Sequence, residues 1–311
     1  MALTADQVRE RVAYIGGSDA AGVLGLSRWT TPLQVWAEKT GEIEPKDLSG
    51  LLPIEVGNEL EDLVCKLWSK RTGKKLRRVN ETQVHANYPF IRCNIDRRVV
   101  GEETIFEAKT ASAWKAKEWE GEDIPGEYIL QCQHNMAVTG AAKCWIAVLI
   151  GGNVDFKYKL IERDPILIAE MVRREADFWL KYVVPKVMPG FITRNDGDIL
   201  FKLFPHGDEG EPAILDDKAN ALIEALTAMG EDKNNIEGQI EKARNELKAM
   251  LGDKTFGVTD RFKVSWKVQI TNRLDGDKIK EKHPKIAAEC MKKSESRVLR
   301  YAILKRATVK A

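Results

Sequence analysis

Apolar residues recur at helical spacing along the first 190 residues of the chain. The clearest case is the stretch 54–72, where apolar residues return every third or fourth position and Gly73 follows as a helix end. Capping residues support other helices: Thr31 and Pro32 begin one, and Gly41 ends it. Helices are predicted for residues 4–11, 19–24, 29–40, 54–72, 128–139 and 164–184.

Four other stretches carry the β-branched and aromatic residues that are typical of strands. Turn residues separate them in pairs, at 101–104 and again at 151–153, so each pair is predicted to form a hairpin. Together the strands predict a mixed sheet of four or five strands flanked by helices, which is an α/β fold. The predicted strands are 95–100, 105–109, 143–150 and 154–161.

A segment rich in Gly and Pro, residues 193–213, is predicted to be a linker. It divides the chain into residues 1–192, which hold the predicted sheet, and residues 214–311, in which no chemistry is visible. A chain of 311 residues is long enough for one large domain and a smaller one.

The second region begins with a heptad seam, a four-three pattern of apolar residues that is broken at Lys233. Because Gly230 and Gly238 weaken the pattern, we expect a short helical hairpin or an oligomer contact rather than a long coiled coil. Two strands within 255–271, then a basic helix and a strand within 278–303, are expected to follow. The seam consists of Leu222, Leu226, Met229, Ile236, Ile240, Ala243, Leu247 and Met250.

Composition excludes several classes of protein. Hydrophobic residues at 43% and charged residues at 31% are ordinary for a globular enzyme. No apolar run approaches the roughly 18 residues of a membrane span, and the N-terminus lacks a signal-peptide pattern. We therefore expect a cytoplasmic protein. The five cysteines contain no C-x-x-C pair, which argues against a disulfide framework, a zinc site or an iron–sulfur cluster.

The net charge of +2 hides an asymmetry along the chain. Residues 215–311 carry 21 Lys and Arg against 15 Asp and Glu, whereas residues 1–214 carry 28 against 32. A basic C-terminal region would add salt-sensitive affinity for phosphates. A merely solvated basic surface explains the same charges equally well.

The charged residues of the first hairpin are placed unusually. Because side chains on a strand alternate between faces, Glu107 and Lys109 lie on one face, which Asp96 on the neighbouring strand can reach. Two carboxylates and an ammonium suit Mg²⁺, which prefers oxygen ligands and completes its shell with water and substrate phosphate. The alternative is a surface hairpin with a cross-strand ion pair, since Glu-x-Lys is a common sequence.

Five segments around this hairpin resemble the YqaJ-type viral recombinases, a lambda-exonuclease-like family within the PD-(D/E)XK nuclease superfamily. They occur in the family order, and the resemblance covers roughly residues 8 to 190. The chain departs from the superfamily pattern at Ile95, which stands where the named proline would be. The segments are Arg11–Leu24, Gly57–Glu61, Asp96, Glu107–Lys109 and Tyr128–Gly140.

This resemblance implies a restriction-endonuclease-like core and an activity. The implied enzyme is a phage or prophage exonuclease that uses Mg²⁺ or Mn²⁺, digests linear duplex DNA 5′→3′ and leaves 3′ single strands for annealing. It also implies that Asp96, Glu107 and the Ala108 carbonyl bind the metal. Lys109, Gln131 and Glu61 would be catalytic, although Glu59 competes with Glu61 for the role of the helix carboxylate.

The resemblance further assigns the 5′-terminal phosphate of DNA to Arg11 and Ser18. The chemistry of these residues suits phosphate binding. Arginine presents several N–H donors in one plane, and the glycines before Ser18 expose backbone N–H groups at the start of a helix. The alternative is a surface arginine and an N-cap serine. Candidate DNA contacts are Lys115, Lys117 and Gln133.

Two ring-bearing residues near the hairpin have alternative roles. Trp114 is expected to pack in the core rather than stack on a base, and His134 is expected to touch DNA or solvent rather than act as a base.

The expected partners are double-stranded DNA ends, a phage single-strand-annealing recombinase and further copies of the chain. The resemblance implies a trimer, and no membrane is involved. Other functions on the same fold are a DNA-binding recombination accessory without exonuclease activity and a structure-specific endonuclease. The intact Asp96, Glu107 and Lys109 argue against a degenerate site.

Overall fold

The computed structural model describes residues 10–45, 50–190, 192–208, 210–292 and 294–302. The chain forms two units, one that ends at Pro205 and one that begins at His206, and each is described by itself. The helix predicted for residues 4–11 lies almost entirely outside the described residues.

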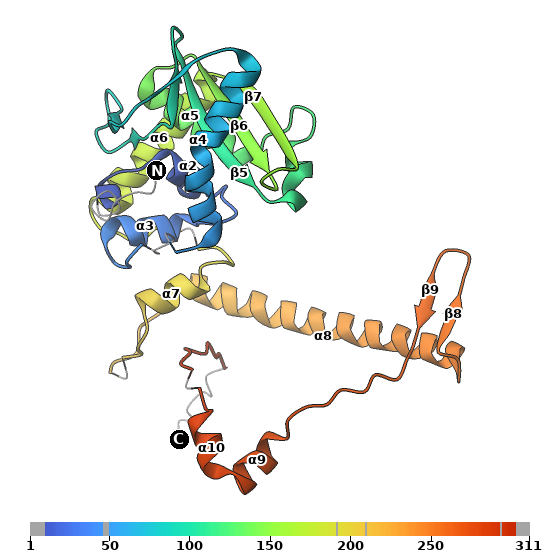
Figure 1. The fold of residues 1–311 in the computed structure, drawn as a ribbon. Coiled ribbons are helices and arrows are strands. Elements are labelled where there is room, and N and C mark those ends of the chain that lie inside the picture. Colours follow the sequence, from blue (N-terminus) through green and yellow to red (C-terminus); the bar gives the residue numbers. More distant parts are fainter. Residues whose placement is uncertain (1–9, 46–49, 191, 209, 293, 303–311) are drawn as a thin grey trace. The chain divides into compact units, whose positions relative to one another are not determined.

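The first unit is built on a five-stranded mixed sheet (Figure 1). The strand order is β1-β4-β5-β6-β7; β5 and β6 are parallel, and the other neighbours are antiparallel. Both predicted hairpins are confirmed, as β4–β5 and β6–β7. A separate two-stranded ribbon pairs β2 with β3. The strands are β1 (Leu76–Arg78), β2 (Gln83–Val84), β3 (Arg92–Cys93), β4 (Arg97–Val99), β5 (Thr104–Ala111), β6 (Lys143–Ile150) and β7 (Asp155–Glu162).

Helices cover both faces of this sheet, as the sequence predicts. Their ends follow the capping signals: Thr31 Oγ1 accepts a hydrogen bond from the Gln34 amide at 3.1 Å, and Gly41 ends the same helix at φ 75°. The helices of this unit are η1 (Arg11–Ala13), α2 (Gly17–Val23), α3 (Pro32–Thr40), α4 (Leu52–Thr72), η2 (Ala113–Trp119), α5 (Gly126–Thr139), α6 (Pro165–Phe178), η3 (Trp179–Val183) and α7 (Gly197–Leu203).

The alternation of side chains along β5 divides the core between α4 and α5. Ile105 packs in a buried cluster with Cys132 and Met136 of α5, whereas Phe106 packs in another with Val64 and Trp68 of α4. By the period of two, Glu107 and Lys109 face the same way as Ile105, toward α5. The face of β5 that carries these two charged residues is therefore the one that α5 covers.

The predicted linker contains a helix that belongs to the first unit, so this prediction is wrong for residues up to 205. Ile199 of α7 is buried in a cluster with Leu33 and Trp36 of α3. Asp196 is fully buried and accepts hydrogen bonds from the Thr31 hydroxyl and the Thr193 amide. Glycine and proline content alone could not reveal the partners on α3 and at Thr31, which lie far away in the sequence.

The second unit contains one long helix, α8 (Asp217–Leu251), instead of the expected helical hairpin. The helix passes through Gly230 and Gly238, because each glycine in a helix interior costs only about 1 kcal/mol relative to alanine. Its heptad seam is exposed along its length, from Leu222 to Met250.

A hairpin and two short helices complete the second unit. β8 (Phe256–Val258) pairs with β9 (Lys263–Ser265), which confirms the two predicted strands. α9 (Gly276–Lys282) and α10 (Pro284–Glu289) occupy the predicted basic helix. The strand expected after them is not found in the described residues of 290–302. In the described part of the chain, no helix is long and apolar enough to span a bilayer.

Candidate active site

The three charged residues predicted from the hairpin lie together. Asp96 directly precedes β4, and its Oδ2 accepts a hydrogen bond from the Ala108 amide of β5 at 2.7 Å. Lys109 Nζ lies 2.7 Å from Glu107 Oε1. Because the N–H and C=O of one strand residue point to the same neighbour, the Ala108 carbonyl leaves β5 on the side of Asp96.

Two amide side chains of α5 complete this cluster. Gln131 Nε2 donates to Glu107 Oε1 at 2.7 Å, and Gln131 Oε1 accepts from Lys109 Nζ at 3.0 Å. Asn135 Nδ2 donates to the other oxygen of Glu107, Oε2, at 3.2 Å. Sequence reasoning missed Asn135; its signal was the spacing of four residues from Gln131, which places both on one helix face.

Burial and like charge shape the electrostatics of the cluster. Burial and the nearby Glu107 carboxylate raise the pKa of Asp96 to about 8. Burial disfavours the Lys109 ammonium, but Glu107 and Asp96 outweigh that effect and raise the pKa of Lys109. Lys109 is therefore a cation in this environment, which suits it to stabilise negative charge rather than to accept a proton.

The donor set of this cluster fits a hard divalent cation. A cation between the buried Glu107 and the half-buried Asp96 would offset the repulsion of their two carboxylates. Within the described ranges, no three His, Cys, Asp or Glu side chains lie together so that they could hold a metal ion. A metal in this cluster would therefore have only two carboxylate ligands, and the Ala108 carbonyl would be the third protein ligand. Two carboxylates and a carbonyl suit Mg²⁺, which usually binds one or two carboxylates and keeps several waters.

The helix carboxylate predicted at residue 61 lies beside the cluster and is paired with an arginine. Glu61 Oε1 is 2.7 Å from Nη1 of Arg97, which also contacts Asp62 and donates to the Asp96 carbonyl. The charge of Glu61 contributes to the raised pKa of Asp96 after burial and Glu107, so the two carboxylates lie near each other. The competing Glu59 is exposed. Arg97 was missed because its partners lie 35 and 36 residues away.

The predicted phosphate-binding pair also comes together. Arg11 Nη2 donates to the Ser18 hydroxyl, and the guanidinium lies 3.6 Å from Asp19 Oδ1. Lys39 Nζ lies 2.7 Å from Asp19 Oδ2, so Asp19 holds two cations at the start of α2. Ser18 lies in the first turn of α2 and is exposed, and Gly16 takes the N-cap position, so the N-cap alternative for Ser18 is wrong.

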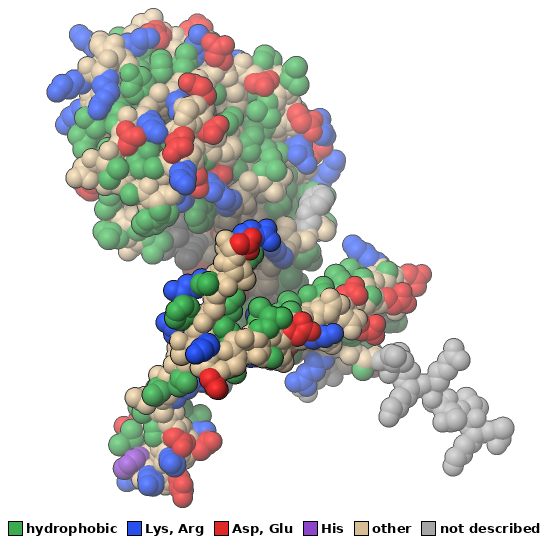
Figure 2. All heavy atoms as spheres, turned by 90° about the vertical axis from the view of Figure 1, so that its right-hand side faces the viewer, with side chains coloured by type: hydrophobic (Ala, Val, Ile, Leu, Met, Phe, Trp, Pro, Cys, Tyr) green, Lys and Arg blue, Asp and Glu red, His purple; other side chains and the backbone are tan. Residues whose placement is uncertain are grey.

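The candidate DNA contacts after β5 lie on η2. Lys117 is exposed, and Lys115 Nζ lies 4.7 Å from the centre of the Trp29 ring, which is itself exposed. Trp114 is 82% exposed, so its expected packing role is wrong; the neighbouring Trp119 fills the core instead. Acidic and basic side chains are interspersed on the face of the first unit drawn in Figure 2.

Two predictions for α5 are wrong because the side chains point into the protein. Gln133 is 3% exposed; it donates to the Glu162 carbonyl and accepts from the Asp164 amide, so it cannot contact DNA. His134 is fully buried between Glu175 Oε1 and the Arg92 carbonyl, each at 2.9 Å. Burial opposes the imidazolium, but Glu175 outweighs that effect and raises the pKa of His134.

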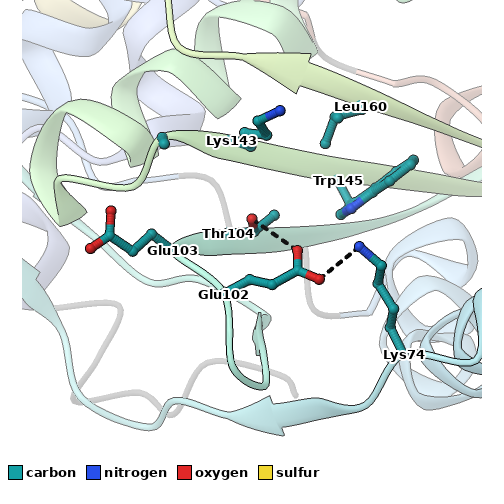
Figure 3. Close-up of a pocket in the computed structure, with 8 residues that line it drawn as sticks. Lys74, Glu102, Glu103, Thr104, Lys143, Trp145 and Leu160 are labelled. Atoms are coloured by element: carbon teal, nitrogen blue, oxygen red, sulfur yellow. Dashed lines mark hydrogen bonds and ion pairs between the residues drawn. The ribbon is translucent and has the colours of Figure 1, made fainter.

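A shallow pocket lies at the other end of β5 and is not part of this cluster (Figure 3). Lys74 Nζ and Glu102 Oε1 are 2.7 Å apart there, and Trp145 lines the same pocket. Thr104 of the pocket precedes Lys109 by about 16 Å along the strand, at roughly 3.3 Å per residue.

Comparisons with solved structures agree with this architecture. The alkaline exonuclease LHK-Exo from Laribacter hongkongensis aligns with a TM-score of 0.52 at 21% identity, over 59% of this chain and 94% of that enzyme. LHK-Exo in complex with dAMP aligns with a TM-score of 0.51 at 23% identity, over the same shares. The similarity confirms the predicted fold, a restriction-endonuclease-like core of mixed sheet and flanking helices.

Sequence comparisons identify the family. The model of the YqaJ-like viral recombinase domain matches residues 7–142. The uncharacterized protein YqaJ of Bacillus subtilis (strain 168) is 36% identical over 295 residues, which cover 93% of this chain and 91% of the relative. This chain therefore belongs to the family of YqaJ-like viral recombinases.

Proposed function

We propose that this protein is a metal-dependent exonuclease that digests linear duplex DNA from 5′ ends and leaves 3′ single strands for recombination by annealing. It would act on phage or prophage DNA in the cytoplasm of the bacterial host. The observation that carries the proposal is the cluster of Asp96, Glu107, Lys109 and Gln131 on one face of the sheet. The solved exonucleases with this fold support the same activity class.

Asp96, Glu107 and the Ala108 carbonyl would hold Mg²⁺ or Mn²⁺. When bound, the cation polarises the scissile phosphate and lowers the pKa of water. The Lys109 ammonium, held between Glu107 and Gln131, would stabilise negative charge that develops on the phosphate oxygens. Gln131 would orient that ammonium through its carbonyl oxygen. The Ala108 amide keeps Asp96 against the strand.

Digestion of two DNA substrates tests the activity. A 5′-phosphorylated linear duplex and a covalently closed circle of the same sequence are incubated with Mg²⁺ and, separately, with EDTA. We expect the enzyme to degrade only the linear duplex and only with Mg²⁺. Cleavage of the circle would indicate an endonuclease, and absence of cleavage with binding retained would indicate a recombination accessory. Strand-specific 5′ and 3′ labels on the linear duplex would report the direction of digestion.

The end of the DNA would be recognised by Arg11 with Ser18. A guanidinium already held by the Ser18 hydroxyl can donate a charge-assisted hydrogen bond to a terminal phosphate. Asp19 and Lys39 fix the surroundings of that guanidinium. Binding of the terminal phosphate by Arg11 would place the first scissile bond at the cluster. This contact should therefore raise the rate of cleavage selectively for phosphorylated ends.

In Arg11→Ala, the preference for 5′-phosphate over 5′-hydroxyl ends should collapse. The phosphorylated substrate should slow toward the hydroxyl rate, a loss on the order of 1.5–3 kcal/mol for one charge-assisted hydrogen bond. Single-turnover digestion of two duplexes that differ only in the 5′-terminal phosphate measures the preference. Arg173→Ala removes an equally cationic surface side chain of α6 and should keep the preference. An unchanged preference in Arg11→Ala would show that the end is recognised elsewhere.

The assembly also follows from the family resemblance. We propose a homo-oligomer, with a trimer expected, and a phage single-strand-annealing protein as partner. The exposed seam of α8 offers apolar surface for contact between copies, from Leu222 to Met250. Sedimentation velocity would measure the oligomeric state, and a purely monomeric species at micromolar concentration would contradict this part of the proposal.

A further inference from the structure

Two amides of α5 hold the opposite oxygens of one carboxylate. Gln131 Nε2 donates to Oε1 of Glu107, and Asn135 Nδ2 donates to Oε2. Because the two amides are four residues apart on one helix, they reach the carboxylate from successive turns. Rotation of the Glu107 carboxylate would therefore break at least one of these hydrogen bonds.

The Asn135 side chain is buried and only half satisfied. The residue is 1% exposed, and its Oδ1 has no hydrogen-bond partner. A carboxylate only accepts hydrogen bonds, so the amide must turn its nitrogen toward Glu107 and its oxygen away. An unsatisfied buried acceptor is unfavourable, which indicates that the contact with Glu107 determines the orientation of Asn135.

Helix α2 approaches the same amides through a glycine. A Cβ atom at Gly17 would lie 2.3 Å from Asn135 Oδ1 and 3.3 Å from Gln131 Cγ. The first distance is shorter than real Cβ atoms show, so a side chain at residue 17 would require the Asn135 amide to shift. An alanine at this position would force the Asn135 amide to move, which would disturb its hydrogen bond to Glu107.

We infer that Asn135 is a positioning residue that fixes the Glu107 carboxylate for metal binding, and that Gly17 preserves this arrangement by leaving room for the Asn135 amide. The inference rests on the proposed metal-dependent function. Partners that orient a metal ligand typically change metal affinity by about 10–100-fold when they are removed. Asn135→Ala should therefore weaken the metal site without removing a ligand.

Binding of Mn²⁺ alone, measured by electron paramagnetic resonance of the free ion, provides a readout that does not depend on cleavage. We expect Asn135→Ala to raise the dissociation constant of Mn²⁺ by about tenfold or more. Gly17→Ala should also raise it, because the added methyl group displaces Asn135. The double variant should bind no more weakly than Asn135→Ala, since the atom that the added methyl group would strike is then absent.

Gln133→Ala is the matched control, because Gln133 is an equally buried amide of α5 that turns away from Glu107. It should lower the melting temperature but leave Mn²⁺ affinity unchanged. If Asn135→Ala does not fold, Asn135→Leu keeps the branched shape of the side chain and removes both polar atoms, of which only the donor Nδ2 has a partner.

Three outcomes separate the claims. Wild-type affinity in the Asn135 variants, or fully additive effects of Gly17→Ala and Asn135→Ala, would overturn the inference while the proposed function stands. If the wild-type protein neither binds Mn²⁺ nor cleaves DNA, the proposed function fails, and the inference fails with it.

Discussion

Glu107→Gln should abolish metal-dependent cleavage of linear duplex DNA, with a loss of at least about 10³-fold, equivalent to about 4 kcal/mol of transition-state stabilisation. Glu107 is 4% exposed, and its two oxygens accept from Lys109, Gln131 and Asn135. Glutamine keeps the size of the side chain but removes the charge that would hold a cation. Asp96→Asn should have a comparable effect, because it removes the second carboxylate.

Affinity for DNA should survive both substitutions. Phosphate contacts position the duplex, and neither carboxylate can make one; removing negative charge should leave duplex affinity equal or higher. Single-turnover digestion and equilibrium binding of the same labelled duplex measure the two effects. Glu102→Gln is the matched control, since Glu102 lies at the far end of the hairpin and pairs with Lys74. Substantial residual cleavage by Glu107→Gln would remove this cluster from consideration as the active site.

Lys109→Ala should slow cleavage by about 10²–10³-fold, the usual effect of removing one preorganised donor from an active site. The ammonium is held at 2.7 Å from Glu107 and at 3.0 Å from Gln131, so it is fixed before substrate binds. Mn²⁺ affinity should not fall, because the lost charge repels a cation. This combination distinguishes a charge-stabilising lysine from one that merely maintains the site.

Lys109→Arg should not restore the rate. A planar fork of donors spreads its charge over several nitrogens and cannot replace one nitrogen that bonds both Glu107 and Gln131. Lys74→Ala provides the control for a lysine of the same unit outside the cluster. Weakened Mn²⁺ affinity in Lys109→Ala, or cleavage at the wild-type rate in Lys109→Arg, would contradict the assigned role.

Local patterns sufficed for most of the first unit. The period of two placed Glu107 and Lys109 on one strand face, and capping residues such as Thr31 and Gly41 located helix ends within a few residues. These features depend on neighbouring residues only, which is why one sequence contains enough information for them. The resemblance then indicated that Gln131 belongs to the same site.

Side chains whose partners are distant in sequence could not be predicted. A polar residue such as His134 is expected at the surface. It is buried instead, and its partner Glu175 lies 41 residues away in the sequence. Trp114 and Trp119 are chemically alike, and only the path of η2 decides that the first is exposed and the second buried. Asn135 is an intermediate case: its spacing of four residues from Gln131 placed both on one helix face, but its partner Glu107 lies on another element.

The most direct test of the central claim is the anomalous diffraction of Mn²⁺ in crystals of the wild-type protein. We predict one strong peak in the anomalous difference map, at a position where a Mn²⁺ ion would be bonded to carboxylate oxygens of Asp96 and Glu107. The Ala108 carbonyl would complete the protein ligands. Crystals of Glu107→Gln, soaked in the same way, should not show this peak. A peak elsewhere on the chain, or no peak at a Mn²⁺ concentration that supports cleavage, would contradict the assignment of these residues as the metal site.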